Sequence, residues 1–269
     1  MGLTYGQRAL MIGALDARNF VGTAEHSRYR DQPFKRLAAT GKMFETVFFG
    51  TRAEADRVLA AVAHMHGPVR GELDGESGGF EPGTGYSAAD PELMLWTIAV
   101  AAESAATLYG LFVRPLGATE LDSFWADWIR FGELFGMPAD VAPQGWEEFR
   151  RYFDERLASD EMGLTAEARR TGLGVAFSIP VPTVQAPAME LHNLLLLGSL
   201  PARVRELYGL RWSMAQHVAW SVAVRTIRTS RQLSPGLIAR GRSGSHFDAV
   251  ARTERSRIAR GNPPIRIDA

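Results

Sequence analysis

Residues 93–113 read LMLWTIAVAAESAATLYGLFV, and this apolar run decides the fold. Glu103 is its only charged residue, and the preceding Asp90-Pro91-Glu92 combines a helix N-cap, a proline at the first helical position and an acidic first turn. The run is long enough to cross a bilayer, but a charge near its centre is costly in lipid. A helix that is apolar all round also occurs at the centre of large helical proteins. We therefore expect a buried central helix and no integral membrane insertion.

Helical patterns occupy most of the chain on both sides of this run. Thr51-Arg-Ala-Glu54 is a capping box that begins one helix. Helical spacing of apolar residues, or an amphipathic composition, marks segments 34–49, 53–66, 119–135, 144–157, 189–198, 201–208 and 212–228. The pattern predicts an all-α fold with one multi-helix domain over residues 1–230 and an Arg-rich extension over residues 231–269.

Strand signals are weak. The best candidate, residues 175–184, contains two prolines and is typical of an extended connector. Two further stretches, 71–89 and 159–174, are rich in glycine and are expected to be loops.

Composition and charge exclude several classes of protein. The chain has no cysteine, which excludes disulfide scaffolds, thiol catalysis and Cys-ligated zinc or iron–sulfur sites. Its 30 basic and 30 acidic residues balance, so there is no global attraction to nucleic acid. Residues 225–269 nevertheless carry ten Arg against three acidic residues. A solvated tail, or a strip docked on the acidic body, is the simplest interpretation, with binding to nucleic acid or anionic lipid as the alternative.

Several catalytic motifs are absent. No histidine has an acidic residue three positions before it or another histidine four positions before it, which argues against a di-iron bundle and an HExxH zinc site. The N-terminus has no basic region ahead of an apolar segment, and Asp16 interrupts it, so we expect a cytoplasmic protein without a signal peptide.

A few polar residues lie on helix faces that are otherwise apolar. Arg36 and Thr40 are four residues apart on one face, His66 ends its helix, and Glu103 lies in the central run. Such side chains need partners or a ligand. Glu103 could pair with a buried arginine, Arg36 or Arg114, while His66 and Arg36 could be ordinary helix-end and surface residues. From these residues alone, the sequence indicates a helical protein with a polar-lined apolar pocket.

Three blocks of sequence carry a more specific signal. Residues 26–40 read HSRYRDQPFKRLAAT, residues 66–71 read HGPVRG, and residues 86–96 read YSAADPELMLW. In order and approximate spacing they resemble the latex-clearing-protein (rubber oxygenase) and MpaB-type oxygenase family. The resemblance covers about residues 20–115.

This resemblance implies a globin-like helical core that binds b-type haem, with the iron held by His66 rather than His64. It places Arg36 and Thr40 in the haem pocket, as both cofactor-binding and catalytic residues. Ala39 stands where rubber-cleaving members can carry a lysine that reaches the iron, which suggests an open or water-occupied distal position. Glu103 could accept a substrate proton if burial raises its pKa.

The resemblance also implies a reaction: a haem-dependent oxygenase or oxidoreductase that acts with O2 on a hydrophobic small molecule. Two alternatives stay open, a haem protein that oxidises no substrate and a haem-free helical protein that binds an apolar ligand. No nucleic-acid partner is expected, and a homo-oligomer is possible.

Overall fold

The computed structural model describes residues 2–26, 33–178, 186–233 and 260. Within them the chain forms eleven α-helices, one short 3-10 turn and a two-stranded antiparallel sheet. In chain order the elements are α1 (Gly2–Gly13), α2 (Ala17–Glu25), α3 (Pro33–Phe49), α4 (Arg52–His66), β1 (Arg70–Glu72), β2 (Gly85–Ser87), α5 (Pro91–Phe112), α6 (Ala118–Leu134), η1 (Ala139–Val141), α7 (Gly145–Ala158), α8 (Ala166–Phe177), α9 (Ala186–Ser199), α10 (Ala202–Tyr208) and α11 (Met214–Leu233). The all-α class predicted from the sequence is confirmed.

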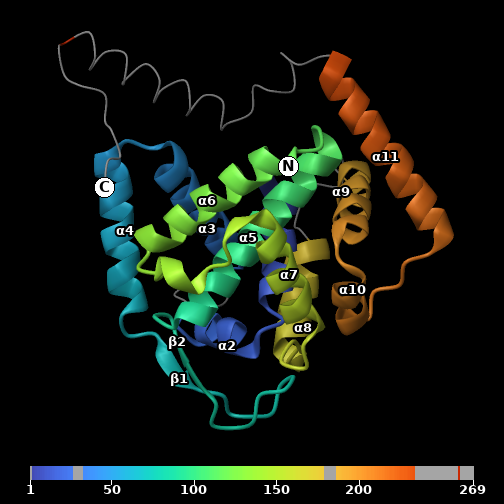
Figure 1. Cartoon of the computed structure of the whole chain (residues 1–269). Helices are drawn as coiled ribbons and strands as arrows, with labels where there is room; N and C mark the ends of the chain where they lie inside the picture. Colours follow the sequence, from blue (N-terminus) through green and yellow to red (C-terminus); the bar gives the residue numbers. More distant parts are fainter. Residues whose placement is uncertain (1, 27–32, 179–185, 234–259, 261–269) are drawn as a thin grey trace.

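Helix α5 lies at the centre of the molecule (Figure 1). Asp90 caps it by accepting a hydrogen bond from the backbone N–H of Glu92, and Trp96 and Ala102 are fully buried. Helices α1, α6 and α11 pack against it. Among the described residues α5 is the one helix long and apolar enough to cross a membrane, and most of it is buried inside the protein. The expectation of a buried central helix is therefore confirmed.

Aromatic stacking joins α5, α6 and α7 into one core. The ring of Trp96 on α5 stacks on Phe153 of α7 with centroids 5.6 Å apart. Trp125 of α6 stacks on Phe149 of α7 at 4.1 Å. These aromatic pairs lock the amphipathic helices α6 and α7 against the apolar helix.

Helices α3 and α4 form a helical hairpin beside this core. Only Gly50 and Thr51 connect them, so the two helices run antiparallel and pack on each other. The predicted capping box is present, because the Thr51 hydroxyl accepts from the Glu54 N–H while the Glu54 carboxylate accepts from the Thr51 N–H. The Phe44 ring of α3 stacks on Phe131 of α6 at 5.0 Å, which attaches the hairpin to the core.

The structure corrects the loop predictions. The expected loop 159–174 contains the beginning of α8, which starts at Ala166 behind a Thr165 cap. The expected loop 71–89 contains β1 and β2, which pair so that Gly71 faces Tyr86. A side chain at Gly71 would lie 2.5 Å from the Tyr86 hydroxyl, so this pairing depends on glycine.

The sequence patterns did not predict the N-terminal helices, and the structure does not test the predicted C-terminal boundary. Helices α1 and α2 were not expected, although α1 packs along α5 and α8. The connector predicted over 175–184 is helical up to Phe177, and its residues 179–184 lie outside the described part. Helix α11 continues to Leu233, and most of the predicted extension 231–269 is also outside the described part, so the boundary at residue 230 stays a prediction.

Candidate functional site

The antiparallel hairpin brings the residues predicted for cofactor binding to one end. Arg36 lies in the first turn of α3, Thr40 one turn later, and His66 is the last residue of α4. Because the start of α3 and the end of α4 are neighbours in an antiparallel pair, these residues share that end of the hairpin. Residues 27–32 of the first sequence block lie outside the described part of the chain.

His66 is available as a ligand. It is exposed, and within the described part of the chain its imidazole makes no hydrogen bond, although its backbone carbonyl accepts from Val69. Partial desolvation of the ring lowers its pKa below the usual value, which favours the neutral form. A neutral imidazole is the form that binds a metal. His64 in the same turn is exposed as well, so the structure leaves both nitrogen donors accessible.

Arg36 is half-buried on α3. Its Nη1 donates to the carbonyl of Thr23 at the end of α2, 3.4 Å away. Burial lowers its pKa, and among the described residues no carboxylate pairs with it. Thr40 is exposed one turn further along α3. A guanidinium in this state, beside a hydroxyl that makes no hydrogen bond within the described part of the chain, is suited to an anionic group of a ligand.

The end of α2 next to Arg36 holds a second polar pair that the sequence patterns did not reveal. The buried Tyr86 of β2 donates its hydroxyl to Glu25, with the oxygens 2.5 Å apart, and the His26 ring meets the Tyr86 ring edge-on. Burial and this hydrogen bond raise the pKa of Tyr86 to about 12. The pair fixes the end of α2, from which Thr23 holds Arg36.

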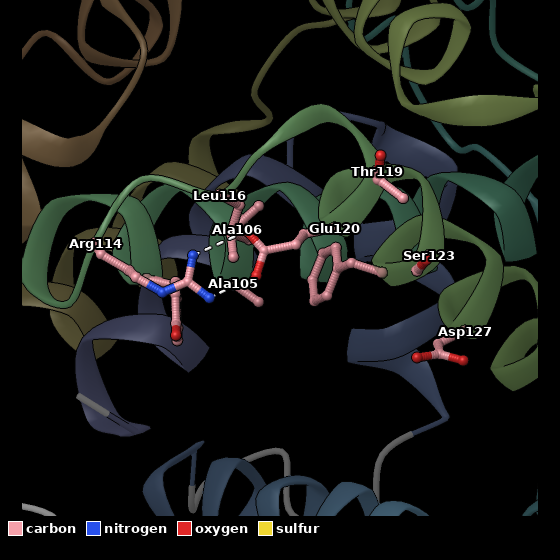
Figure 2. A pocket seen from close by; sticks show the side chains of 10 residues that line it. Ala105, Ala106, Arg114, Leu116, Thr119, Glu120, Ser123 and Asp127 are labelled. Carbon is pink, nitrogen blue, oxygen red and sulfur yellow. Dashed lines mark hydrogen bonds and ion pairs between the residues drawn. The ribbon is translucent and has the colours of Figure 1, made fainter.

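A pocket of about 600 Å³ opens between α5 and α6. Figure 2 shows its side chains on α5, on the connection to α6 and on α6 itself, around an open space. Ala105, Ala106 and Phe124 supply much of its apolar surface. Arg114 donates two hydrogen bonds to Glu120 at the rim, at 2.8 and 2.5 Å, and these hold the pKa of Glu120 at about 2. The volume is typical of pockets that bind small molecules or cofactors.

Glu103 belongs to a different arrangement. Its carboxylate accepts two hydrogen bonds from Arg8 of α1, one from Arg150 of α7 at 3.2 Å and one from the Thr107 hydroxyl at 2.8 Å. Arg8 itself is buried and also donates to the carbonyl of Ser199. The expected pairing with a buried arginine is confirmed, but the named partners Arg36 and Arg114 are wrong. Arg8 on α1 and Arg150 on α7 take that place instead.

The pKa of Glu103 also moves the other way from the expectation. Burial alone would raise it, but the charge and hydrogen bonds of Arg8, with the hydrogen bond from Thr107, hold it below the usual range. The condition under which Glu103 was expected to accept a substrate proton is thus not met. The sequence did contain a signal for its partner, because a lone arginine inside the apolar segment 2–13 needs a buried counter-charge.

Comparison with known proteins identifies the family. Residues 1–229 match the family described as ER-bound oxygenase mpaB/B'/rubber oxygenase, catalytic domain. The chain therefore belongs to this family of oxygenase catalytic domains. No curated protein and no solved structure matched it.

Proposed function

We propose that this oxygenase domain binds haem b through His66 and uses O2 to oxidise a hydrophobic small molecule. The observation that carries the proposal is the end of the α3–α4 hairpin, where an accessible imidazole with a lowered pKa lies at the same end as an arginine that pairs with no carboxylate of the described residues. Family membership supports oxygenase chemistry in general. Haem as the cofactor and a hydrophobic molecule as the substrate are the parts that we propose.

The donor set of the described residues suits haem better than a metal ion bound by protein alone. Among those residues no group of three or more His, Asp or Glu side chains could hold a metal ion together. Haem would need only one protein nitrogen, because the porphyrin itself supplies nitrogen donors to the iron. His66 provides that nitrogen, and Arg36 provides a cation for the propionates.

Each residue then has a defined task. His66 binds the iron, Arg36 neutralises a propionate, and the Thr40 hydroxyl offers a hydrogen bond on the same side of α3. Bound haem would supply the chemistry of O2 activation, which no side chain of this protein can perform. The small side chain of Ala39 leaves room for a ligand beside Thr40. Ala105, Ala106 and Phe124 form an apolar wall that would contact a hydrophobic substrate.

Glu103 has no proton-transfer task in this proposal. It is buried between Arg8 and Arg150, and its lowered pKa keeps it ionised. Its task is to join α5 to α1 and α7, which holds the wall of the pocket in place.

A second candidate function is binding of an apolar ligand without haem. The observation that favours it is the pocket between α5 and α6, whose apolar lining does not depend on a metal. The cytoplasmic location and the possible homo-oligomer stay predictions.

The deciding experiment is an absorption spectrum of the purified protein together with a pyridine haemochrome assay. We expect a Soret band and close to one b-type haem per chain, lost in His66→Ala and retained in the matched control His64→Ala. Uptake of O2 in the presence of alkene substrates then tests the reaction. A wild-type protein that stays colourless after titration with haem would contradict the proposal and favour the apolar-ligand alternative. Loss of haem in His64→Ala alone would move the ligand to His64.

A further inference from the structure

One wall of the pocket between α5 and α6 carries a row of polar side chains. Thr119, Ser123 and Asp127 line the pocket and follow one another at intervals of four residues on α6, so they share one helix face. Figure 2 shows the three along α6, apart from Arg114. All three are exposed, and within the described part of the chain their side chains make no hydrogen bond or ion pair. The row therefore presents two hydroxyl groups and one carboxylate to a ligand.

The arginine that lines the pocket is already occupied. Arg114 donates to both carboxylate oxygens of Glu120, at 2.8 and 2.5 Å, and its Nη1 also donates to the carbonyl of Pro115 at 3.1 Å. Its guanidinium lies over the Tyr109 ring, 5.9 Å from the ring centroid. Two parallel hydrogen bonds between a guanidinium and a carboxylate form a strong, oriented pair. A carboxylate ligand would therefore have to break this pair before it gained a cation.

The lining as a whole carries one uncompensated charge. Its charged members are Arg114, Glu120 and Asp127, and the first two cancel each other. Arg130, three residues further along α6, does not line the pocket and forms no ion pair with Asp127. The pocket is thus negative along the polar row and neutral at the ion pair.

We propose that this pocket binds an apolar molecule with a protonated amino group, which donates to the Asp127 carboxylate and the Ser123 hydroxyl. An ammonium has three donors and no acceptor, which suits a wall of oxygen acceptors. The apolar body of the molecule would lie against Ala105, Ala106 and Phe124. The volume of about 600 Å³ is in the range of sites for one small molecule. An apolar carboxylate fits less well, because it would meet Asp127 and find no free cation.

As a statement about the substrate, this inference rests on the proposed function, and the oxidised molecule would then be a hydrophobic amine. Binding to the pocket itself requires neither haem nor O2. A protein that binds amines but no haem would lose the oxygenase proposal and keep the pocket as a ligand site. The two proposals can therefore fail separately.

The test is a ligand-observed NMR titration of the full chain with n-octylamine, 1-octanol and octanoate at neutral pH. These probes share one alkyl chain and differ in the head group. We expect octylamine to bind up to about fivefold more tightly than octanol, the range for an exposed ion pair, and octanoate to bind most weakly. Asp127→Asn should remove the preference for octylamine. The matched control is Asp140→Asn, which changes an exposed aspartate of η1 outside the pocket and should leave the preference intact.

A second variant tests the occupied arginine. Glu120→Gln removes the carboxylate that pairs with Arg114, so octanoate should bind this variant more tightly than it binds the wild type. A structural disturbance of the pocket would instead weaken all three probes together. The substituted side chains are exposed, and circular dichroism shows whether the variants remain folded.

Four results would overturn the proposal. None of the probes could bind saturably, octanoate could bind the wild type as tightly as octylamine, or Asp127→Asn could keep the preference for octylamine. The wild type could instead form a dimer that octylamine dissociates, seen by sedimentation velocity, which would assign the pocket to a basic side chain of a second copy.

Discussion

The polar side chains on the two sides of the central helix α5 differ in burial and in hydrogen bonding. On the side of α1 and α7, Glu103 is buried, and its hydrogen-bond donors among the described residues are two arginines and one hydroxyl. On the side of the α3–α4 hairpin, the large apolar residues Phe48 and Met65 are exposed, and so is His66. On the first side, which we call the closed side, the buried polar group is fully hydrogen-bonded. On the second, the open side, the candidate ligand-binding side chain is exposed to solvent.

This difference separates structural polar residues from candidates for binding. Removing one partner of a buried charge is strongly destabilising, so a fully hydrogen-bonded network such as that of Glu103 contributes to the stability of the fold. A ligand needs donors or acceptors that are not already paired. Within the described part of the chain the His66 imidazole makes no hydrogen bond, and Arg36 makes one, to the Thr23 carbonyl. Chemical type alone did not distinguish the two cases, because all three residues are polar groups on helices.

The largest expected effect comes from breaking the closed side. Glu103→Ala leaves the buried Arg8 without its counter-charge, and we expect the free energy of unfolding to fall by about 3–5 kcal/mol. Chemical denaturation measures this change. The matched control Glu120→Ala removes an exposed partner of Arg114 and should leave the denaturation midpoint nearly unchanged. A stable Glu103→Ala protein that had lost only activity would show that Glu103 acts in catalysis instead.

A smaller effect is expected from detaching the open side. Phe44 stacks on Phe131 and contacts Trp128, so Phe44→Ala removes part of the attachment of α3 to α6, which Phe48 shares through its own stacking on Phe131. Because Phe44 is half-buried, the cost should be about 2 kcal/mol, below that of a fully buried phenylalanine. Limited proteolysis should then cut preferentially within α3 and α4. Phe49→Ala is the control, because the Phe49 ring contacts Phe48 of the same helix. If both variants resist proteolysis equally, other contacts hold the hairpin against the core.

The smallest effect is the acid dependence of the closed side. The folded-state pKa of Glu103 lies below its ordinary value of 4.5, so its ion pairs stabilise the fold fully above that value. This contribution is lost as the pH falls from 4.5 through the lowered pKa. We expect Glu103→Gln to flatten that part of the stability–pH curve, measured by urea denaturation at successive pH values. Identical slopes in wild type and variant would assign the acid sensitivity to other carboxylates.

The parts of the fold that were predictable are those whose signals are local. The capping box at Thr51 and the Asp90-Pro91-Glu92 start of α5 are both present, because a cap depends on residues within one turn. Helix α8 was missed because Gly172 and Gly174 lower the helix propensity of its segment. Tertiary packing overrides that preference, since Tyr208 lies so close to Gly172 that a Cβ there would be 2.6 Å from its hydroxyl.

The features of the candidate site also separate into those predictable from local sequence and those set by tertiary packing. The sequence by itself determined the all-α class, the buried central helix and the placement of Arg36, Thr40 and His66 on neighbouring helices, since these depend on periodicity and short connections. Only the tertiary structure decided which charges meet. Arg8 and Glu103 are 95 residues apart, and their pairing follows from α1 packing along α5, which no local pattern encodes.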